Sequence, residues 1–247
     1  MELNEFFREN PKTALGFSGG VDSAYVLAEG LRLGARVQPY FVKTAFQPAF
    51  ELADARRLCA ELGVGLEVVQ VDVLAVEQVR RNPADRCYHC KSALFGALRD
   101  RALADGYPVL LDGTNASDDA GDRPGMRALT ELAVRSPLRE CGITKEEVRR
   151  RSKELGLFTW DKPAYACLAT RVPAGETLSG ELLQRVEKAE DFLFSLGFTD
   201  FRVRVFHGAA RLQLPRSQMA KAIGLGEEIR EGIGAYFAPV LLDLQER

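Results

Sequence analysis

A short glycine-rich stretch, SGGVDS at residues 18–23, lies between an apolar run and a helical pattern. The apolar run, residues 13–17, is typical of a buried strand, and apolar residues then recur at helical spacing, at Ala24, Val26, Leu27 and Leu31. A strand, a tight turn and a helix in this order surround one concavity with backbone N–H groups and the positive end of a helix, which together bind phosphate. The sequence therefore predicts a phosphate-binding loop after the first strand.

The individual residues of the loop suit this purpose. Gly19 and Gly20 permit positive φ and a close approach of the backbone to a ligand. Ser18 and Ser23 offer hydroxyl donors, and Asp22 offers a carboxylate for a Mg²⁺ ion that bridges phosphates. The stretch is not a Walker A loop, because no Lys follows its glycines. The other interpretation is an ordinary glycine turn between a strand and a helix.

Strand-like and helical segments alternate through the first two thirds of the chain. Five strands are expected, at residues 13–17, 37–42, 66–71, 108–111 and 133–138. Helices between them favour βαβ units and a parallel sheet covered on both faces. Ligands of such sheets bind beyond the carboxyl ends of the strands. The polar turn at residues 112–115 follows a strand, so we expect its Gly113 and Thr114 to border the same ligand as the loop.

The pattern changes after an irregular stretch over residues 158–175. Two helices are expected beyond it, at residues 178–196 and 218–225, together with three strands at residues 201–206, 211–214 and 236–244. This is the pattern of a small α+β module. We therefore predict an α/β domain over residues 1–172 and a smaller α+β domain, for substrate binding or oligomerisation, over residues 173–247.

Composition narrows the class of protein. The chain has 247 residues and a formal net charge of −2, which argues against general nucleic-acid binding. No apolar run approaches the length of a membrane span, and the first ten residues lack the form of a signal peptide. Five cysteines, an odd number, make a disulfide framework unexpected. These features favour a cytoplasmic protein without membrane or nucleic-acid partners.

Three of the cysteines stand out. Cys87 and Cys90 form a CxxC pair at the start of a helix expected over residues 86–105, and Cys167 lies alone in the irregular stretch. The pair lacks the further ligands of a zinc site, whereas three thiolates would leave one iron of a [4Fe–4S] cluster free. A redox pair, or two helix cysteines facing the core, are the other interpretations of the CxxC.

Cys167 also has an interpretation of its own. Lys162 and Arg171 flank it, and their charge would favour a thiolate that attacks an activated carboxylate. The alternative is an inert loop cysteine.

Arginines mark a second candidate site. Arg202 and Arg204 project from one face of an expected strand, and two guanidinium groups side by side suit a phosphate or carboxylate. Arg171 could join them, and Glu190 on the preceding helix could bind a divalent ion. A solvated outer face of the sheet is the alternative.

Several motifs together resemble the LarE family of the PP-loop ATP pyrophosphatase superfamily. In chain order they are SGGVDS at 18–23, RCYHCK at 86–91, DGTN at 112–115, RPG at 123–125, RSPL at 135–138, WDKP at 160–163, ACL at 166–168 and the segment 202–208. The resemblance covers nearly the whole chain, and only the first motif is widespread. It implies the PP-loop, or adenine nucleotide alpha hydrolase-like, type of parallel sheet.

The resemblance also implies a reaction. The family converts the carboxylates of pyridinium-3,5-biscarboxylic acid mononucleotide to thiocarboxylates for the nickel-pincer nucleotide, the cofactor of lactate racemase. ATP with Mg²⁺ adenylates a carboxylate, and a sulfur nucleophile then displaces AMP. Residues 18–23 would hold pyrophosphate, residues 112–114 would border the nucleotide, Arg202 and Arg204 would bind the substrate phosphate, and Glu190 would bind a metal. A homo-oligomer and partner enzymes of the same biosynthesis are also implied.

Two modes of sulfur delivery occur in the family. Either the cysteine matching Cys167 gives up its own sulfur, or cysteines matching Cys87, Cys90 and Cys167 hold a [4Fe–4S] cluster that carries a transferable sulfide. All three cysteines are present here, so the cluster mode is expected. Gln213 departs from the family, because an acidic residue is expected there, and this puts the metal site in doubt. The alternatives are a PP-loop tRNA thiolase and a nucleotide-sensing module without activity.

Overall fold

The structure is a computed structural model that describes residues 1–118 and 124–247. Arg123, part of one of the family motifs, lies outside the described residues. The chain forms two compact units. Unit 1 consists of Met1–Val73 and Asp85–Lys162, and unit 2 consists of Leu74–Ala84 and Pro163–Arg247. The second boundary, after Lys162, falls earlier than the boundary expected after residue 172. The division also assigns the segment Leu74–Ala84, from the first half of the chain, to unit 2.

Unit 1 is built on a parallel sheet of four strands. These are β1 (Lys12–Gly16), β2 (Arg36–Lys43), β3 (Glu67–Gln70) and β4 (Val109–Leu111), in the spatial order β3-β2-β1-β4. All three pairings are parallel, as βαβ connections require. The α/β class and the parallel sheet are therefore confirmed.

The expectation of a fifth strand at residues 133–138 is wrong. Only one isolated parallel bridge, between Leu111 and Arg135, forms in that segment. The backbone of Ala133 has a positive φ of 54°, and Pro137, which has no N–H to donate, begins the short helix α7 (Pro137–Glu140). Extended backbone is therefore limited to the few residues between them.

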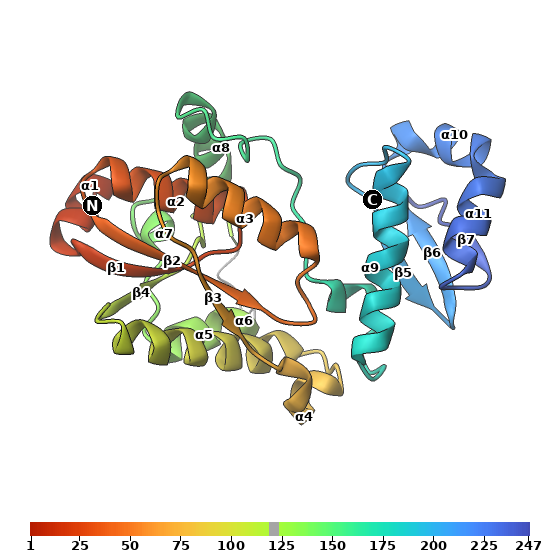
Figure 1. Cartoon of the computed structure of the whole chain (residues 1–247), viewed down its shortest axis with the longest axis horizontal. Helices are drawn as coiled ribbons and strands as arrows, with labels where there is room; N and C mark the ends of the chain where they lie inside the picture. The colour runs from red at the N-terminus through yellow and green to blue at the C-terminus, as the bar shows by residue number, and fades with distance from the viewer. Residues whose placement is uncertain (119–123) are drawn as a thin grey trace. The chain divides into compact units, whose positions relative to one another are not determined.

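Helices cover both faces of the sheet, as Figure 1 shows. The helices of unit 1, α7 apart, are α1 (Leu3–Glu9), α2 (Val21–Arg32), α3 (Ala49–Glu61), α5 (Arg86–Ala104), α6 (Pro124–Glu131) and α8 (Lys145–Glu154). Helices α2 and α3 lie on one face of the sheet and α5 lies on the other. No helix in the described part of the chain combines the length and apolar character needed to cross a membrane.

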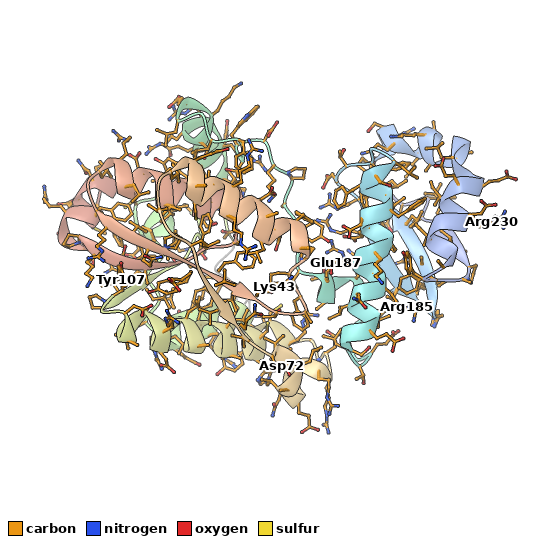
Figure 2. All side chains as sticks on the ribbon, viewed as in Figure 1. Lys43, Asp72, Tyr107, Arg185, Glu187 and Arg230 are labelled. Atoms are coloured by element: carbon orange, nitrogen blue, oxygen red, sulfur yellow. The ribbon has the colours of Figure 1, made fainter. Side chains whose placement is uncertain are left out.

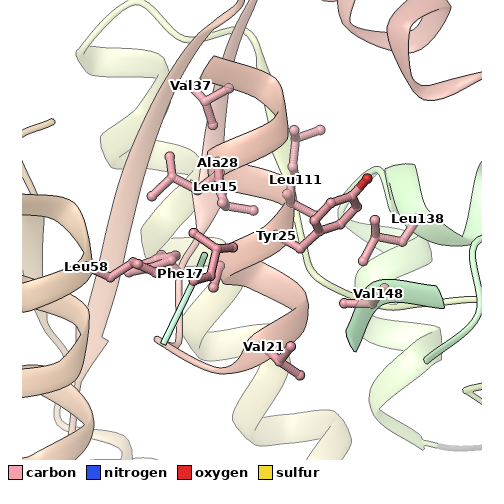
Figure 3. Close-up of a cluster of buried hydrophobic side chains, with 14 of the residues drawn as sticks. Leu15, Phe17, Val21, Tyr25, Ala28, Val37, Leu58, Leu111, Leu138 and Val148 are labelled. Carbon is pink, nitrogen blue, oxygen red and sulfur yellow. The ribbon is translucent and has the colours of Figure 1, made fainter. Parts of the chain in front are cut away.

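Alternate residues of the strands face opposite cores. Leu15 and Phe41 belong to the larger cluster, which α2 and α3 complete with residues such as Tyr25 and Leu58 (Figure 3). Their neighbours Ala14 and Tyr40 belong to a second cluster, under α5. Burial on both faces explains why neighbouring residues of the central strand β1, such as Ala14 and Leu15, are both buried. Both cores hold the strand ends that carry the loops.

Unit 2 has a small mixed sheet with helices. Strand β5 (Arg202–Phe206) pairs antiparallel with β6 (Ala209–Gln213), which pairs parallel with β7 (Val240–Leu242). The helices are α4 (Glu77–Arg80), α9 (Gly180–Ser195), α10 (Arg216–Gly224) and α11 (Gly226–Gly234), of which α11 is absent from the sequence prediction. Arg185 of α9, labelled in Figure 2, donates to the carbonyl oxygen of Tyr236 at 2.8 Å and fixes the segment after α11.

Hydrogen bonds explain why residues 74–84 belong to unit 2. Asn82 is buried, with a positive φ of 53°, and its side-chain amide donates to the carbonyl oxygen of Pro173 at 2.7 Å. Its own carbonyl accepts from Gly175 N at 2.7 Å, and Leu178 N donates to Arg80 O at 2.8 Å. These contacts attach the excursion to the segment that leads into α9.

Candidate active site

The SGGVDS stretch joins β1 to α2 as expected. The hydroxyls of Ser18 and Ser23 lie 3.1 Å apart, and Gly20 N donates to Ser18 Oγ at 3.3 Å. Gly20 is the N-cap of α2 and makes no side-chain cap hydrogen bond. The N–H groups of the first helical turn therefore have no intrahelical acceptor and are available to an anion.

Two glycines keep the loop close to its neighbours. Gly19 has a positive φ of 71°, a backbone conformation that other residues adopt only with strain. A Cβ atom on Gly113 would lie 2.8 Å from the backbone nitrogen of Ser23. The turn after β4 therefore touches the first turn of α2, and only glycine fits at that contact.

A buried carboxylate organises this turn. Asp112 Oδ1 accepts hydrogen bonds from Thr114 N at 3.1 Å and Ser136 Oγ at 2.7 Å, and Thr114 Oγ1 donates to the other oxygen. Asp112 is 5% exposed. Gly113 thus lies beside the loop, on a backbone held by internal hydrogen bonds, and its role with Thr114 at a bound nucleotide stays a prediction.

Two lysines that the sequence interpretation did not place at this loop contact it. Lys145 Nζ lies 2.5 Å from Asp22 Oδ2, and Asn115 Nδ2 donates to the other oxygen of Asp22 at 3.2 Å. Lys162 Nζ lies 2.6 Å from Asp54 Oδ2 and 3.4 Å from the carbonyl oxygen of Gly19. Lys145 follows Thr144, the N-cap of α8, and nothing in the local sequence signals a contact with the loop.

An apolar pocket adjoins the loop. It has a volume of about 130 Å³ and includes Gly16, Phe17 and Ser18 from the end of β1. The other lining residues come from the end of β2, the turn after it and α5: Tyr40, Phe41, Val42, Gln47, Leu94, Phe95 and Leu98. Lys43 lies at the same strand end (Figure 2) and donates to the carbonyl oxygen of Gln47. A flat apolar ring with a polar edge suits such a pocket.

Cys87 and Cys90 lie in the first two turns of α5, which begins at Arg86 as expected. Their spacing of three residues puts both side chains on one side of the helix. Cys87 is exposed and Cys90 half-buried, and a guanidinium nitrogen of Arg86 lies 3.9 Å from Cys87 Sγ. The interpretation that both cysteines face the core therefore fails for Cys87.

The other cysteines separate into two kinds. Cys59 is buried, and desolvation raises the pKa of its thiol to about 11, so it is core packing. Burial likewise raises the pKa of the Cys141 thiol. Cys167 is half-buried and precedes a short 3-10 helix, Leu168–Arg171. Thiols are the soft donors that iron–sulfur clusters take, and the assignment of Cys87, Cys90 and Cys167 to such a cluster stays a prediction.

A bidentate ion pair is buried in unit 2. Arg171 Nε and a terminal nitrogen of Arg171 lie 2.8 and 3.1 Å from the two oxygens of Glu190, and both side chains are at most 1% exposed. Val203 N donates to Glu190 at 2.9 Å, and Tyr165 OH donates to its other oxygen. The remaining nitrogen of Arg171 donates to the carbonyl oxygen of Ala166 at 2.7 Å. This pair therefore fixes the backbone next to Cys167.

The strand arginines are partly buried rather than solvated. Arg202 donates to the carbonyl oxygens of Phe201 and Ala164, each at 2.6 Å, and has no carboxylate partner among the described residues. Burial and the nearby charge of Arg171 lower the pKa of Arg202 to about 10. Arg204 donates to the carbonyl oxygen of Thr170 at 2.7 Å and to Gln213 Oε1, and burial lowers its pKa. An anion would relieve this excess of positive charge.

The expected residues thus lie in three groups. Unit 1 contains the loop with the turn at Gly113 and, separately, Cys87 with Cys90. In unit 2, Arg171, Arg202 and Arg204 donate to backbone carbonyls on both sides of Cys167, and Glu190 pairs with Arg171. Within residues 1–118 and 124–247, no three His, Cys, Asp or Glu side chains gather as a preformed metal site.

Comparison with known proteins identifies close relatives. The chain is 40% identical to an uncharacterized protein of Synechocystis sp. over 98% of this chain and 92% of the relative. It is 32% identical to the pyridinium-3,5-bisthiocarboxylic acid mononucleotide synthase of Lactiplantibacillus plantarum, over 94% of this chain and 86% of that protein. No protein-family model matches the chain.

A more distant similarity involves a PP-loop enzyme of RNA modification. The chain is 28% identical to the tRNA-specific 2-thiouridylase MnmA of Thermotoga sp., over 61% of this chain and 54% of that protein. The similarity to the synthase is higher and extends over both units. The chain therefore belongs to the family of pyridinium-3,5-bisthiocarboxylic acid mononucleotide synthase, the LarE family.

Proposed function

We propose that this protein is an ATP-dependent sulfurtransferase that converts the carboxylates of pyridinium-3,5-biscarboxylic acid mononucleotide to thiocarboxylates for the nickel-pincer nucleotide. The similarity to a synthase of this name over 94% of the chain carries the proposal. A free carboxylate has no usable leaving group, so ATP must first activate it. In this proposal a substrate oxygen attacks the α-phosphorus, pyrophosphate leaves, and sulfur then displaces AMP from the acyl carbon.

Unit 1 would bind and orient ATP. Ser18, Gly19, Gly20 and Ser23 would surround the pyrophosphate with N–H and hydroxyl donors, because the cap of α2 is open to an anion. Asp22 offers the hard oxygen ligand that suits Mg²⁺. The adjoining apolar pocket would take the adenine ring, and Gly113 and Thr114 would lie beside the sugar and phosphates.

Unit 2 would bind the pyridinium nucleotide and position the sulfur donor. Arg202 and Arg204 lack carboxylate partners in the described chain, which suits them to the substrate phosphate. Arg171 would add its positive charge to theirs and hold the backbone at Cys167. Glu190 is engaged by Arg171, Tyr165 and Val203, so a metal role for it would require Arg171 to leave.

We propose that Cys87, Cys90 and Cys167 hold a [4Fe–4S] cluster, which when bound would supply a transferable sulfide. Their soft thiols and partial exposure fit the group. The other mode, sacrifice of the Cys167 sulfur, leaves Cys87 and Cys90 without a function. The product would pass to the other enzymes of nickel-pincer nucleotide synthesis in the cytoplasm, and a homo-oligomer is expected.

A tRNA thiolase is the second candidate function. The match to MnmA covers only 54% of that protein, and a net charge of −2 gives no basic footprint for RNA. An RNA gel-shift assay distinguishes the two, since the proposed function predicts no shift with tRNA. A nucleotide-sensing module, the inactive alternative, would bind ATP without releasing pyrophosphate.

The test is an anaerobic reaction with ATP, Mg²⁺ and the carboxylated nucleotide. AMP, pyrophosphate and a thiocarboxylate should form together, and Cys87→Ala should abolish both iron binding and thiocarboxylate formation. Cys141→Ala is the matched control, because its thiol lies outside the proposed ligands. Release of pyrophosphate without any thiocarboxylate in the iron-loaded wild type would refute the proposed function.

A further inference from the structure

Lys145 reaches the phosphate loop from a distant part of the sequence. It is the first residue of α8, and its ammonium nitrogen lies 2.5 Å from Asp22 Oδ2. The two side chains are 33% and 23% exposed, so the pair lies at the surface of the loop rather than in the core. An ion pair with this exposure contributes little to stability and can separate at low cost.

The loop itself lacks a cation. A Walker A loop has a Lys that reaches the β- and γ-phosphates, whereas SGGVDS has Asp22 at its helical end. Polyphosphate carries several negative charges, and an unneutralised carboxylate beside it would oppose binding. Lys145 contacts a side chain of the loop, that of Asp22. Lys162, in contrast, contacts the loop at the carbonyl oxygen of Gly19.

The backbone of Lys145 is held in place, whereas its side chain is long and flexible. Thr144 caps α8 by accepting from Glu147 N, and Lys145 N donates to Ser117 Oγ at 3.0 Å. The backbone is thus fixed on both sides of the residue. A Lys side chain carries three donors on a flexible stem, so its ammonium group can move a few ångströms without any change of fold.

We propose that Lys145 is a phosphate-binding residue that Asp22 holds in place until ATP arrives. When Mg²⁺ and ATP bind, Asp22 turns to the metal and Lys145 to a phosphate oxygen, so one ion pair is exchanged for two. Lys145 would then do from α8 what the Walker A lysine does from within its loop. This inference rests on the proposed function, because it requires ATP at the loop.

The test is ATP affinity, measured by calorimetric titration with Mg²⁺ and without the carboxylated nucleotide. Lys145→Met should weaken ATP binding about 10- to 100-fold, the value of one or two charge-assisted hydrogen bonds. Lys145→Arg should recover most of the loss, since it restores the charge. Lys153→Met is the matched control, because Lys153 is an exposed lysine of the same helix. This variant should bind ATP with the affinity of the wild type.

A second measurement avoids any dependence on the variant's fold. Acetylation of lysines in the wild-type protein, followed by peptide mass analysis, should show that ATP with Mg²⁺ protects Lys145 and leaves Lys153 unprotected. Wild-type ATP affinity in Lys145→Met, or unchanged acetylation of Lys145 with ATP bound, would overturn the inference and leave the proposed function standing. A wild type that binds no ATP at all would overturn both.

Discussion

Each unit contains an ion pair between a carboxylate and a cation, and the two pairs differ in their exposure to solvent. At the loop of unit 1, Asp22 and Lys145 form an ion pair that is about one quarter to one third exposed. In unit 2, Arg171 and Glu190 form a pair that is at most 1% exposed and has further hydrogen bonds on both sides. Solvent compensates either partner when the first pair separates, whereas separation of the second leaves a buried charge.

This difference teaches where exchange with a ligand is possible. Asp22 can exchange Lys145 for a metal ion at small cost, so an acidic residue at that position is suited to binding a metal. Glu190 can give up Arg171 only with loss of the structure around Cys167, so its charge is first of all part of the fold. The expectation that Glu190 binds a metal came from its residue type and position on a helix, neither of which reports burial.

The largest effect is expected from breaking the buried pair. Arg171→Leu leaves Glu190 charged and without its partner, and it should lower the free energy of unfolding by about 3–5 kcal/mol. Urea unfolding followed by circular dichroism measures this loss. Arg81→Leu, which removes the exposed pair with Glu77 in the same unit, should change stability by less than about 1 kcal/mol. Similar effects of the two substitutions would contradict the comparison.

The exposed pair should show the opposite behaviour. Asp22→Asn should slow AMP formation about 100-fold or more, because the metal ligand at the developing phosphate charge is lost. The same change should alter the free energy of unfolding by less than about 1 kcal/mol. Rate and stability are measured on one preparation. A large loss of stability with the rate preserved would show that Asp22 is structural.

Arg202 sharpens the contrast within unit 2, because it is buried without a carboxylate. Arg202→Leu should raise the KM for the carboxylated nucleotide about 10- to 100-fold and leave the KM for ATP unchanged. Its stability should fall far less than that of Arg171→Leu, since folding already lowers the pKa of Arg202 to about 10 and so disfavours its charge. Arg216→Leu, at an exposed position of α10, is the control. Equal rises of both KM values would count against phosphate binding by Arg202.

The smallest effect is expected at the contact between the turn and the loop. Gly113→Ala places a methyl group 2.8 Å from Ser23 N, so the loop must shift, and ATP affinity should fall about tenfold. Gly96→Ala in α5 meets no atom within 4 Å and should bind ATP normally, with a gain in stability of up to about 1 kcal/mol. ATP titrations of both variants measure the difference. Unchanged affinity in Gly113→Ala would show that the turn is not part of the site.

Sequence patterns predicted the elements that depend on a short stretch of neighbouring residues. The loop between β1 and α2 and the start of α5 at Arg86 both follow from short motifs and were confirmed. Helix α11 was missed because three glycines lower its helical propensity. The expected strand at residues 133–138 failed because Ala133 and Pro137 interrupt extended backbone at both ends.

The parts of the site that depend on distant contacts were harder to predict. Lys145 lies more than 100 residues from Asp22 in the sequence, so the contact between them depends on the fold. The segment 74–84 belongs to unit 2 through hydrogen bonds such as that from Asn82 to Pro173. No local pattern signals either contact. The near-complete burial of Arg171 and Glu190 is likewise a property of packing, which residue type alone does not report.

The central claim is sulfur transfer that leaves the chain intact. Its most direct test is the intact mass of the protein after one anaerobic reaction with ATP, Mg²⁺ and the carboxylated nucleotide, together with iron and sulfide analysis. The account predicts an unchanged mass, roughly four irons per chain and a thiocarboxylate product. A loss of about 34 Da at Cys167, one H₂S, from protein without iron would contradict it and show that the cysteine gives up its own sulfur.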